Sequence, residues 1–184
     1  MCRNAWFYLH QIGRIKKYLT GEQVKSVIHA HVTSRLDQNN SLLLGLQKQK
    51  LTKLQHVQNA AARLISGTKL RDHISPVLRQ LHWLPIEQRI LYKVLVLVYK
   101  ALNGYGPAYL HDLLQPYVPL RELRISQHHL LCVPKTKYVV TERRAFGIRG
   151  PTEWNKLPFE LRCKETLSSF KGGLKTHLFL VAYD

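Results

Sequence analysis

Apolar residues recur every three or four positions at the start of the chain, a spacing that predicts an amphipathic helix. These positions are Trp6, Leu9, Ile12, Ile15 and Leu19. A second helix is expected after Thr20, because threonine can cap a helix and Gln23, three residues later, can complete a reciprocal capping box. The first part of the chain is therefore expected to be helical.

A third helix is predicted over residues 48–66 and is expected to end at Gly67, because glycine readily adopts the left-handed conformation that closes a helix. Its apolar face consists of Leu51, Leu54, Val57, Ala61, Leu64 and Ile65. The opposite face carries a narrow polar stripe, spaced four, three and four, of Thr52, His56, Asn59 and Arg63.

The middle of the chain is divided by prolines and glycines. Ser75 as a cap, with Pro76 at the first helical position, predicts a short helix that Leu84 and Pro85 break. A long helix, apolar on most sides, is expected over residues 86–103 and ends at Gly104. A further helix is expected over 108–114.

The last third of the chain has a different character, since five prolines interrupt it from Pro116 onwards. Short apolar or β-branched runs at 130–133, 138–141 and 145–148 predict a small set of strands. Residues 153–155 are expected to begin a turn of helix, and 167–182 to form a final helix weakened by Gly172 and Gly173. The predicted fold class is mainly α: a helical domain over 1–115, then a small basic α+β segment over 116–184 with a C-terminal helix.

Composition agrees with a folded chain, because 45% of the 184 residues are apolar. The most apolar stretch, residues 94–99, is much shorter than the roughly 20 residues that a membrane span requires. The first ten residues lack a signal-peptide pattern, and the three distant cysteines favour a reducing compartment. We therefore expect an intracellular protein, nuclear or cytoplasmic, with no membrane partner.

The charge is strongly one-sided, with 28 Lys and Arg residues against 11 Asp and Glu and a net charge of +17. Residues 1–75 have a net charge of +9, residues 76–118 of +2 and residues 119–184 of +6. A nearly neutral middle with two basic flanks indicates an acidic partner, such as nucleic acid.

Several kinds of chemistry find no support in the sequence. The acidic residues are scattered without a local pair, so a two-metal site is not indicated. The ten histidines show no metal-ligand spacing, and no nucleophile elbow or phosphate-binding glycine loop is present. We expect no catalytic residues, no metal, no cofactor and no small-molecule substrate.

Basic residues interleaved with aromatic ones remain as the candidate site, because cations neutralise phosphates and exposed rings can stack on unpaired bases. The same cations could instead form a merely solvated face. The candidate nucleic-acid-binding residues are Arg14, Lys16, Lys17, Lys48, His56, Asn59, Arg63, Lys135, Lys137, Arg143, Arg144 and Arg149.

Six stretches, in order, resemble one family. They are VTSRLDQNNSLLLGL at 32–46, LQHVQNAAARLISGT at 54–68, HISPVLRQLHWLPIEQRI at 73–90, YKALNGYGPAYLHDLL at 99–114, ERRAFGIRGPTEWNKLP at 142–158 and SFKGGLKTHLF at 169–179. Together they resemble the region that follows the palm in the reverse transcriptases of LINE-type, jockey-like retrotransposons. The chain departs from the family at Gln38-Asn39 and at Gln47-Lys48.

The resemblance implies a thumb-like helical bundle that helps to hold template RNA and the primer–template duplex. It also implies a catalytically incomplete fragment, because the palm motif with its two aspartates and the endonuclease are not among these residues. A palm domain is then a second expected partner. The alternative is a structural or interaction remnant without a selected function. Family signature positions, none of them catalytic in the family, are Arg35, Asn59, Arg63, His82, Trp83 and Trp154.

Overall fold

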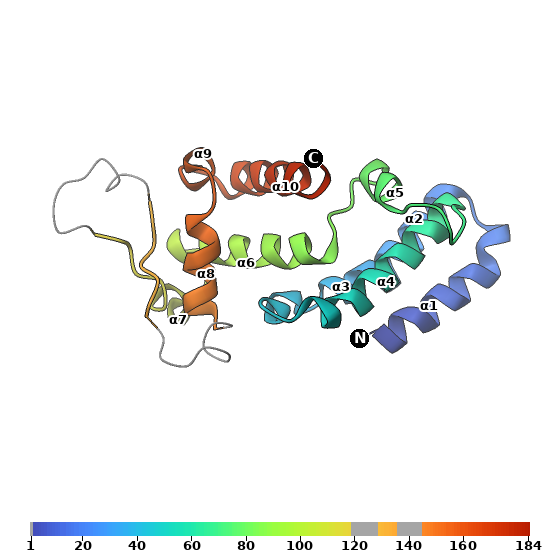
Figure 1. Cartoon of the computed structure of the whole chain (residues 1–184), viewed down its shortest axis with the longest axis horizontal. Coiled ribbons are helices and arrows are strands. Elements are labelled where there is room, and N and C mark those ends of the chain that lie inside the picture. Colours follow the sequence, from blue (N-terminus) through green and yellow to red (C-terminus); the bar gives the residue numbers. More distant parts are fainter. Residues whose placement is uncertain (1, 119–128, 136–144) are drawn as a thin grey trace. The chain divides into compact units, whose positions relative to one another are not determined.

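The structure, a computed structural model, describes residues 2–118, 129–135 and 145–184, and these residues are mainly helical (Figure 1). The first half of the chain contains α1 (Cys2–Ile15), the 3-10 helix η1 (Lys16–Tyr18), α2 (Gly21–Ile28), the π-helix η2 (His29–Thr33), α3 (Ser34–Asp37), the 3-10 helix η3 (Asn40–Leu43) and α4 (Lys48–Ser66). The remainder contains α5 (Ser75–Gln80), α6 (Ile86–Leu102), α7 (Ala108–His111), α8 (Phe146–Asn155), α9 (Phe159–Arg162) and α10 (Leu167–Tyr183). The mainly α fold class is confirmed.

The chain forms two compact units. Unit 1 comprises Met1–Ile90 and Phe179–Asp184, and unit 2 comprises Leu91–Leu178. Each of the helices α6 and α10 thus contributes residues to both units. The border between these compact units differs from the domain boundary expected near residue 116. The expectation that residues 1–115 form a domain by themselves stays a prediction.

The core of unit 1 lies among α1, α2, η2 and α4, and α1 and α4 lie side by side (Figure 1). From α1 it takes Ala5, Leu9 and Ile12, which are spaced four and three apart and therefore share one face of the helix. Trp6 and Ile15, which the sequence placed on the apolar face of this helix, are each 46% exposed. The buried face of α1 thus keeps the predicted Leu9 and Ile12, but it is narrower than the predicted face and excludes Trp6 and Ile15.

Local signals predicted the start of α2 and both ends of α4. Thr20 and Gln23 form the capping box at the start of α2, each side chain accepting a hydrogen bond from the other residue's backbone N–H. Helix α4 has the predicted bounds, and Gly67 closes it with a φ of 74°.

The turn after α5 is closed by a histidine in place of a glycine. The Trp83 N–H donates to the Leu78 carbonyl at 2.9 Å and the His82 N–H donates to the Arg79 carbonyl at 3.0 Å, a Schellman motif with His82 at φ 53°. Helix α5 therefore ends at Gln80, before the predicted break at Leu84 and Pro85. The predicted Ser75 cap is wrong, because Ser75 is the first residue of α5 and Ile74 occupies the cap position without a side-chain hydrogen bond.

Helix α6 begins at Ile86 as predicted and ends one residue early, at Leu102, followed by Gly104 at φ 72°. The Tyr105 N–H donates to the Lys100 carbonyl at 2.8 Å across this glycine, which satisfies one of the last helical carbonyls. Helix α7 is shorter than predicted, since it ends at His111.

The predicted strands are not formed within the described residues. The predicted strand at 145–148 is wrong, because Ala145 is the N-cap of helix α8 and the next residues form its first turn. Helix α8 continues through Pro151 to Asn155. It therefore also contains the helical turn that was predicted to start at 153. Residues 130–133 form only a single bridge, between Leu131 and Pro116. The third predicted strand, at 138–141, lies outside the described residues.

Tertiary packing explains the helix over 146–155. Gly150 lies so close to α6 that an added Cβ would be 3.0 Å from the Val98 Cγ2. Trp154, four residues later on the same face, is 2% exposed and packs against Phe170, with ring centroids 5.7 Å apart. This buried face favours helix despite Pro151, a residue that local propensity treats as a breaker.

In the described parts of the chain, no helix is both long enough and apolar enough to span a membrane.

Candidate nucleic-acid interface

The polar stripe on α4 lies beside a groove of unit 1. The groove has a volume of about 540 Å³ and lies between α1, α4 and the loop after α4. Its lining residues are Trp6, His56, Asn59, Ala60, Arg63, Leu64 and Leu70. Three of the four residues of the predicted stripe therefore line one hollow, and the fourth, Thr52, is bonded to the Lys48 carbonyl.

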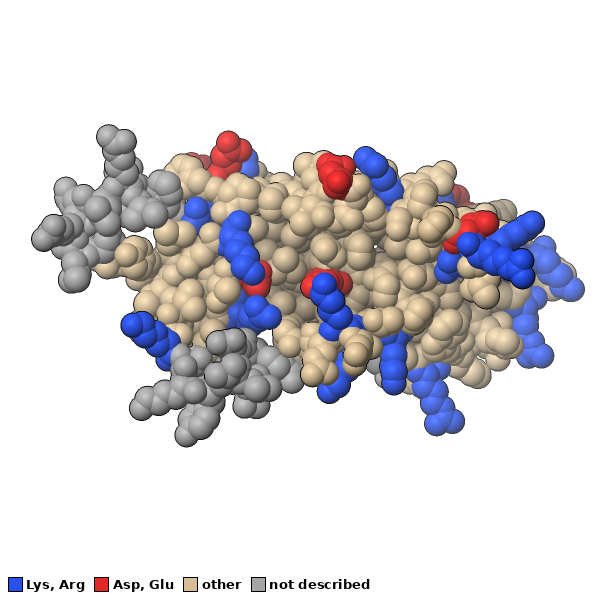
Figure 2. Space-filling model, viewed as in Figure 1, with Lys and Arg blue, Asp and Glu red and all other residues tan. Residues whose placement is uncertain are grey.

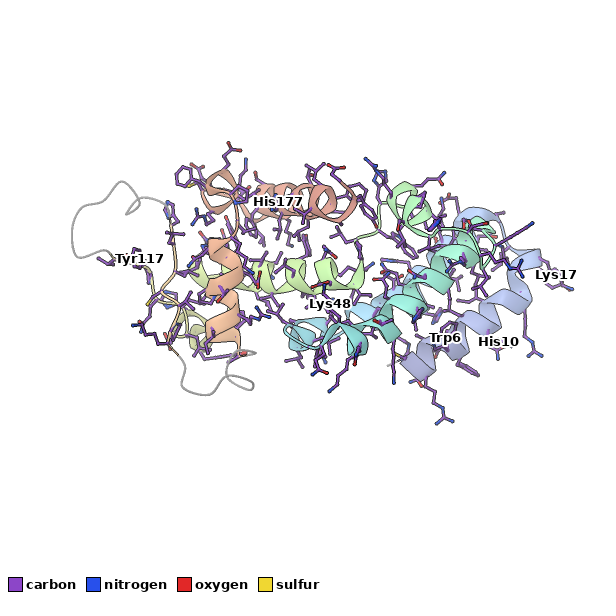
Figure 3. All side chains as sticks on the ribbon, viewed as in Figure 1. Trp6, His10, Lys17, Lys48, Tyr117 and His177 are labelled. Atoms are coloured by element: carbon purple, nitrogen blue, oxygen red, sulfur yellow. The ribbon has the colours of Figure 1, made fainter. Side chains whose placement is uncertain are left out.

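Trp6 gives this groove an aromatic wall. Its side chain is nearly half exposed on α1, where Figure 3 labels it. Leu70, 84% exposed, contributes apolar surface from the loop that follows α4. An open hollow with an indole, apolar surface and a few polar groups has the composition of a site for a planar ligand.

Arg63 is the principal charged group of the groove. Its Nε donates to the Lys69 carbonyl at 3.3 Å and its Nη2 donates to the Asp72 carbonyl at 3.1 Å. Both acceptors are neutral, so these bonds fix the guanidinium in place without cancelling its charge. Arg63 thus holds the loop of residues 67–74 against α4 and still presents a positive charge at the groove.

Asn59 belongs to a hydrogen-bond network within unit 1. Its Oδ1 accepts a hydrogen bond from the Gln55 Nε2 at 2.8 Å, and the Gln55 Oε1 accepts one from the Ile86 N–H at 2.9 Å. Gln55 therefore satisfies an orphan donor at the start of α6, and Asn59 orients Gln55. Asn59 lines the groove, but its carbonyl oxygen is already engaged in this network.

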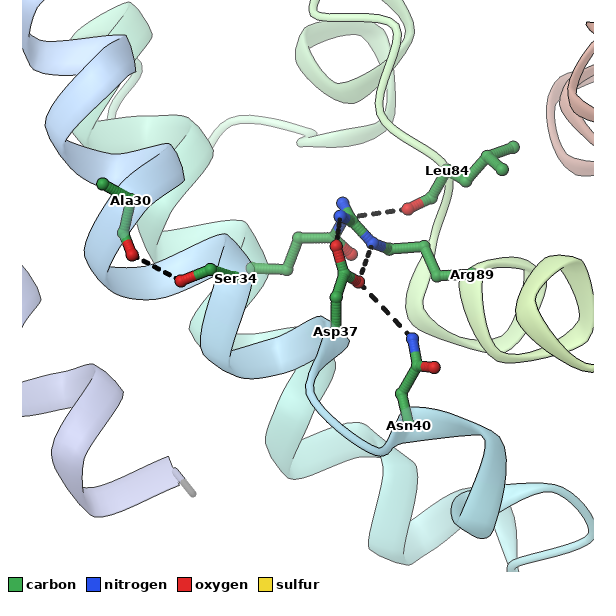
Figure 4. A network of polar contacts seen from close by, with 7 residues as sticks. Ala30, Ser34, Asp37, Asn40, Leu84 and Arg89 are labelled. Atoms are coloured by element: carbon green, nitrogen blue, oxygen red, sulfur yellow. Dashed lines mark hydrogen bonds and ion pairs between the residues drawn. The ribbon is translucent and has the colours of Figure 1, made fainter.

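The same network includes a fully buried amide. Gln58 is 1% exposed; its Nε2 donates to the Leu84 carbonyl at 2.8 Å, and its Oε1 accepts a bond from Gln55. Figure 4 shows this bond to Leu84 next to the ion pair between Asp37 and Arg89. Gln55 and Gln58 of the LQHVQNAAARL stretch thus attach the segment around Leu84 to α4. Their polar character alone did not predict this structural role.

The N-terminal basic group lies on α1 and η1. Arg14 and Lys17 are exposed, Lys16 is half-buried, and the Lys17 Nζ lies 4.8 Å from the ring centre of Tyr18. Figure 3 labels Lys17 here, and Figure 2 shows Lys and Arg side chains projecting from the end of the view at which Figure 1 draws α1. All three predicted cations are therefore on the surface of unit 1.

Lys48 is exposed at the start of α4 and lines a second hollow, of about 210 Å³, which Glu87 also lines. A carboxylate on the same rim weakens the attraction of this hollow for phosphate. Lys48 is thus a poorer candidate than Arg63.

The predicted cations of unit 2 have different outcomes. Lys137, Arg143 and Arg144 lie outside the described residues, and Lys135 is exposed. Arg149 stays a prediction; its Nη1 lies 3.2 Å from an oxygen of Glu153, a mostly buried carboxylate that also binds Lys156 at 2.9 Å. Arg149 is therefore largely committed to a structural ion pair.

The remaining signature positions also have structural contacts. The Arg35 guanidinium lies 4.8 Å from the Tyr8 ring centre. The carbonyl of Trp83 accepts a bond from the Tyr183 hydroxyl at 2.5 Å. In unit 2, the Trp154 Nε1 donates to the His129 carbonyl at 2.9 Å, and Asn155 bonds both backbone groups of Leu131.

Sequence reasoning missed Trp6 as a functional candidate. The available signal was that Trp6, Phe7 and Tyr8 are consecutive, because three neighbouring residues of a helix cannot share one buried face. In the part of the chain that the structure describes, no group of three or more His, Cys, Asp or Glu residues is arranged to hold a metal ion.

No protein-family model, curated protein or solved structure significantly matches this chain.

Proposed function

We propose that this chain is the post-palm, thumb-like region of a LINE-type reverse transcriptase and that it binds single-stranded RNA of the template. The resemblance of six ordered sequence stretches supports the family. The groove that combines the Trp6 indole with the Arg63 guanidinium, which donates to two backbone carbonyls, supports the activity, and it is the observation on which the proposal rests.

The groove suits an unpaired strand. An exposed indole face can stack on a base, which in a duplex is already stacked between its neighbours. Arg63, fixed by two backbone carbonyls, can approach a phosphate without first becoming ordered. His56 is exposed on α4 one turn before Ala60 and can add a hydrogen bond to the strand.

The proposal concerns binding and includes no reaction, because the residues of the groove do not form an acid–base or nucleophile pair. The net charge of +17 is expected to supply most of the affinity through the phosphates.

The first experiment is a titration of the full chain with a labelled single-stranded oligoribonucleotide over a series of salt concentrations. A binder that contacts about five phosphates should give a log–log slope of about −3.5. No binding at low salt, or a slope near zero, would reject the proposed function.

A second experiment tests the groove. His56→Ala and Trp6→Leu should each weaken binding, while Lys171→Gln, a change on α10, should have a smaller effect. Arg63→Gln should also reduce the salt slope by about 0.7. Because Arg63 holds a loop, its variant is interpreted only together with a thermal melt, and His56→Ala, an exposed change, keeps the test independent of folding. Unchanged affinity in all three groove variants would remove the groove from the proposal.

A specific observation favours a second candidate function, that of an interaction module for a palm domain or another protein. Large apolar side chains are exposed on unit 1, among them Phe7, Leu70 and Val181. Exposed apolar surface promotes association when its partner is missing. A chain that sediments as a concentration-dependent oligomer and does not bind RNA would support this function in place of the first.

A further inference from the structure

The outer face of α1 carries a stripe that lies apart from the groove and includes one of the predicted cations, Arg14. Arg3, Phe7, His10 and Arg14 are spaced four, three and four apart, so they follow one line along the helix. All four side chains are exposed, and Phe7 is 58% exposed. We name this set the α1 stripe; Figure 3 labels His10 within it.

The α1 stripe is distinct from the face by which α1 packs in unit 1. That face uses Ala5, Leu9 and Ile12, which are all buried in the core shared with α2 and α4. An exposed phenylalanine on the opposite side gains nothing from that core. Its exposed ring, which lies between cations, is therefore accessible to a partner.

An aromatic band crosses the α1 stripe at Phe7. Successive residues of an α-helix are about 100° apart, so Trp6, Phe7 and Tyr8 extend around much of its circumference. Trp6 lines the groove, and the rings of Phe7 and Tyr8 meet edge to face with centroids 5.6 Å apart.

The band continues beyond α1 at Tyr8. The Tyr8 ring stacks on His31, with centroids 5.1 Å apart and an interplanar angle of 20°, and the Arg35 guanidinium lies 4.8 Å from its centre. His31 belongs to the π-helix η2, a rare element that is frequent at functional sites. Aromatic and cationic groups thus extend from the groove, across Phe7, to η2.

The charge on α1 itself has one sign. Helix α1 contains no acidic residue, and the first acidic residue of the chain is Glu22. The Glu22 carboxylate lies 2.6 Å from the Lys25 Nζ, so its charge is already paired. Phosphates near Arg3 and Arg14 would therefore meet little repulsion.

We propose that the α1 stripe binds a single-stranded nucleic acid that crosses α1 from the groove, with a base stacked on Phe7 and phosphates near Arg3 and Arg14. This inference rests on the proposed function, since it extends the path of the same strand. The combination of cations with an isolated, exposed ring favours an unpaired strand, because stacking is independent of sequence and requires a free base face.

A lipid surface fits the α1 stripe less well. A helix that lies on a membrane inserts a broad apolar face between the lipid headgroups. The apolar face of α1 is occupied by the core of unit 1, which leaves Phe7 as the apolar residue of the stripe. An anionic membrane therefore serves as an alternative outcome of the test.

The test uses the full chain and a labelled oligouridylate, with Phe7→Leu and the double variant Arg3→Gln/Arg14→Gln. Loss of stacking at Phe7 should weaken binding by about 5- to 140-fold. Loss of two cations should reduce the salt slope by about 1.4. The matched controls are Tyr109→Leu, an exposed ring on α7, and Lys171→Gln/Lys175→Gln on α10, and both should have smaller effects.

Ultraviolet cross-linking provides a direct readout. A uridine stacked on Phe7 should form an adduct within the peptide that contains residues 4–14, and Phe7→Leu should remove that adduct. Because Phe7 is exposed, this variant should melt at the same temperature as the unchanged protein.

The outcomes separate the two proposals. If the unchanged protein binds the strand but neither stripe variant weakens binding, the α1 stripe is rejected and the proposed function stands. If the unchanged protein does not bind the strand, both proposals fail. If Phe7→Leu weakens binding to vesicles that contain phosphatidylserine but not to RNA, the stripe is a membrane contact and the inference is overturned.

Discussion

Arg89 forms a bidentate ion pair with Asp37, which lies 52 residues earlier in the chain (Figure 4). The Arg89 Nε donates to the Asp37 Oδ1 at 2.9 Å, and the Arg89 Nη2 donates to the Asp37 Oδ2. The Arg89 side chain is 15% exposed and that of Asp37 is 36% exposed. The pair joins the end of α3 to the first turns of α6 within unit 1. Such geometry is stronger than that of a typical surface pair.

Arg89→Gln is expected to lower the free energy of unfolding by about 1–3 kcal/mol, because Asp37 would keep its charge without its partner. Urea titration measures this change. The matched control is Glu22→Gln, which breaks an exposed pair with Lys25 and should change stability by less than about 0.5 kcal/mol. Equal losses in the two variants would contradict a special role for the Arg89 pair.

Gln58→Leu is expected to destabilise the protein by about 1–3 kcal/mol. The leucine has a similar size, but the buried Leu84 carbonyl and the Gln55 amide would lose a partner. Chemical denaturation gives the difference, and Gln49→Leu on the exposed side of α4 serves as the control. A stabilising Gln58→Leu would show that the buried amide is replaceable by apolar packing.

The two adjacent glycines of α10 should respond differently to alanine. No atom lies within 4 Å of a Cβ added at Gly172, so Gly172→Ala should raise stability by about 0.5–1 kcal/mol through the entropy of the unfolded chain. A Cβ at Gly173 would be 2.7 Å from the Leu161 Cδ2, and moving that side chain off its rotamer costs about 0.5–1.5 kcal/mol. Thermal melts compare Gly172→Ala with Gly173→Ala. An equal rise in melting temperature in both variants would contradict the close packing of Leu161 against Gly173.

Burial raises the pKa of Tyr183 from 10.0 to about 12, and its hydroxyl donates to the Trp83 carbonyl. The folded state therefore favours the neutral phenol. This contribution to stability is fully present below pH 10, and it is lost as the pH rises through 12. The free energy of unfolding of Tyr183→Phe should therefore fall less steeply over this pH range than that of the unchanged protein. Unfolding experiments at several pH values measure the difference. A parallel decline in both proteins would show that Tyr183 does not titrate as an isolated, buried group.

Several helix ends followed from local chemistry, although Ser75 did not cap α5 and Pro85 did not mark its end. Thr20 with Gln23 predicted the start of α2, and Gly67 and Gly104 marked helix ends because their lack of a Cβ permits a left-handed backbone. His82 follows α5 in the same left-handed conformation, but a histidine in the sequence does not predict a helix end. The helix over 146–155 was missed because burial of Gly150 and Trp154 outweighs the local effect of Pro151.

The candidate site was predictable only in part. The spacing of His56, Asn59 and Arg63 placed them on one face of α4, since the period of a helix determines which residues share a side. Periodicity could not show that Trp6 of another helix lines the same groove. It also could not show that Arg149 pairs with Glu153, or that Arg63 donates to backbone carbonyls. Those relations depend on which residues distant in sequence are brought together.

The sequence by itself determined the mainly helical class, most helix ends and the excess of positive charge, because these depend on local propensity, capping and composition. Only the tertiary structure decided how much of the apolar surface of α1 is buried: Leu9 lies in the core, whereas Trp6 and Phe7 stay exposed. The physical reason is that a helix with apolar residues on several sides has more than one face that could be buried. The packing of α1 on α2 and α4 selects one of them, and the aromatic residues left outside form the proposed path for a nucleic-acid strand.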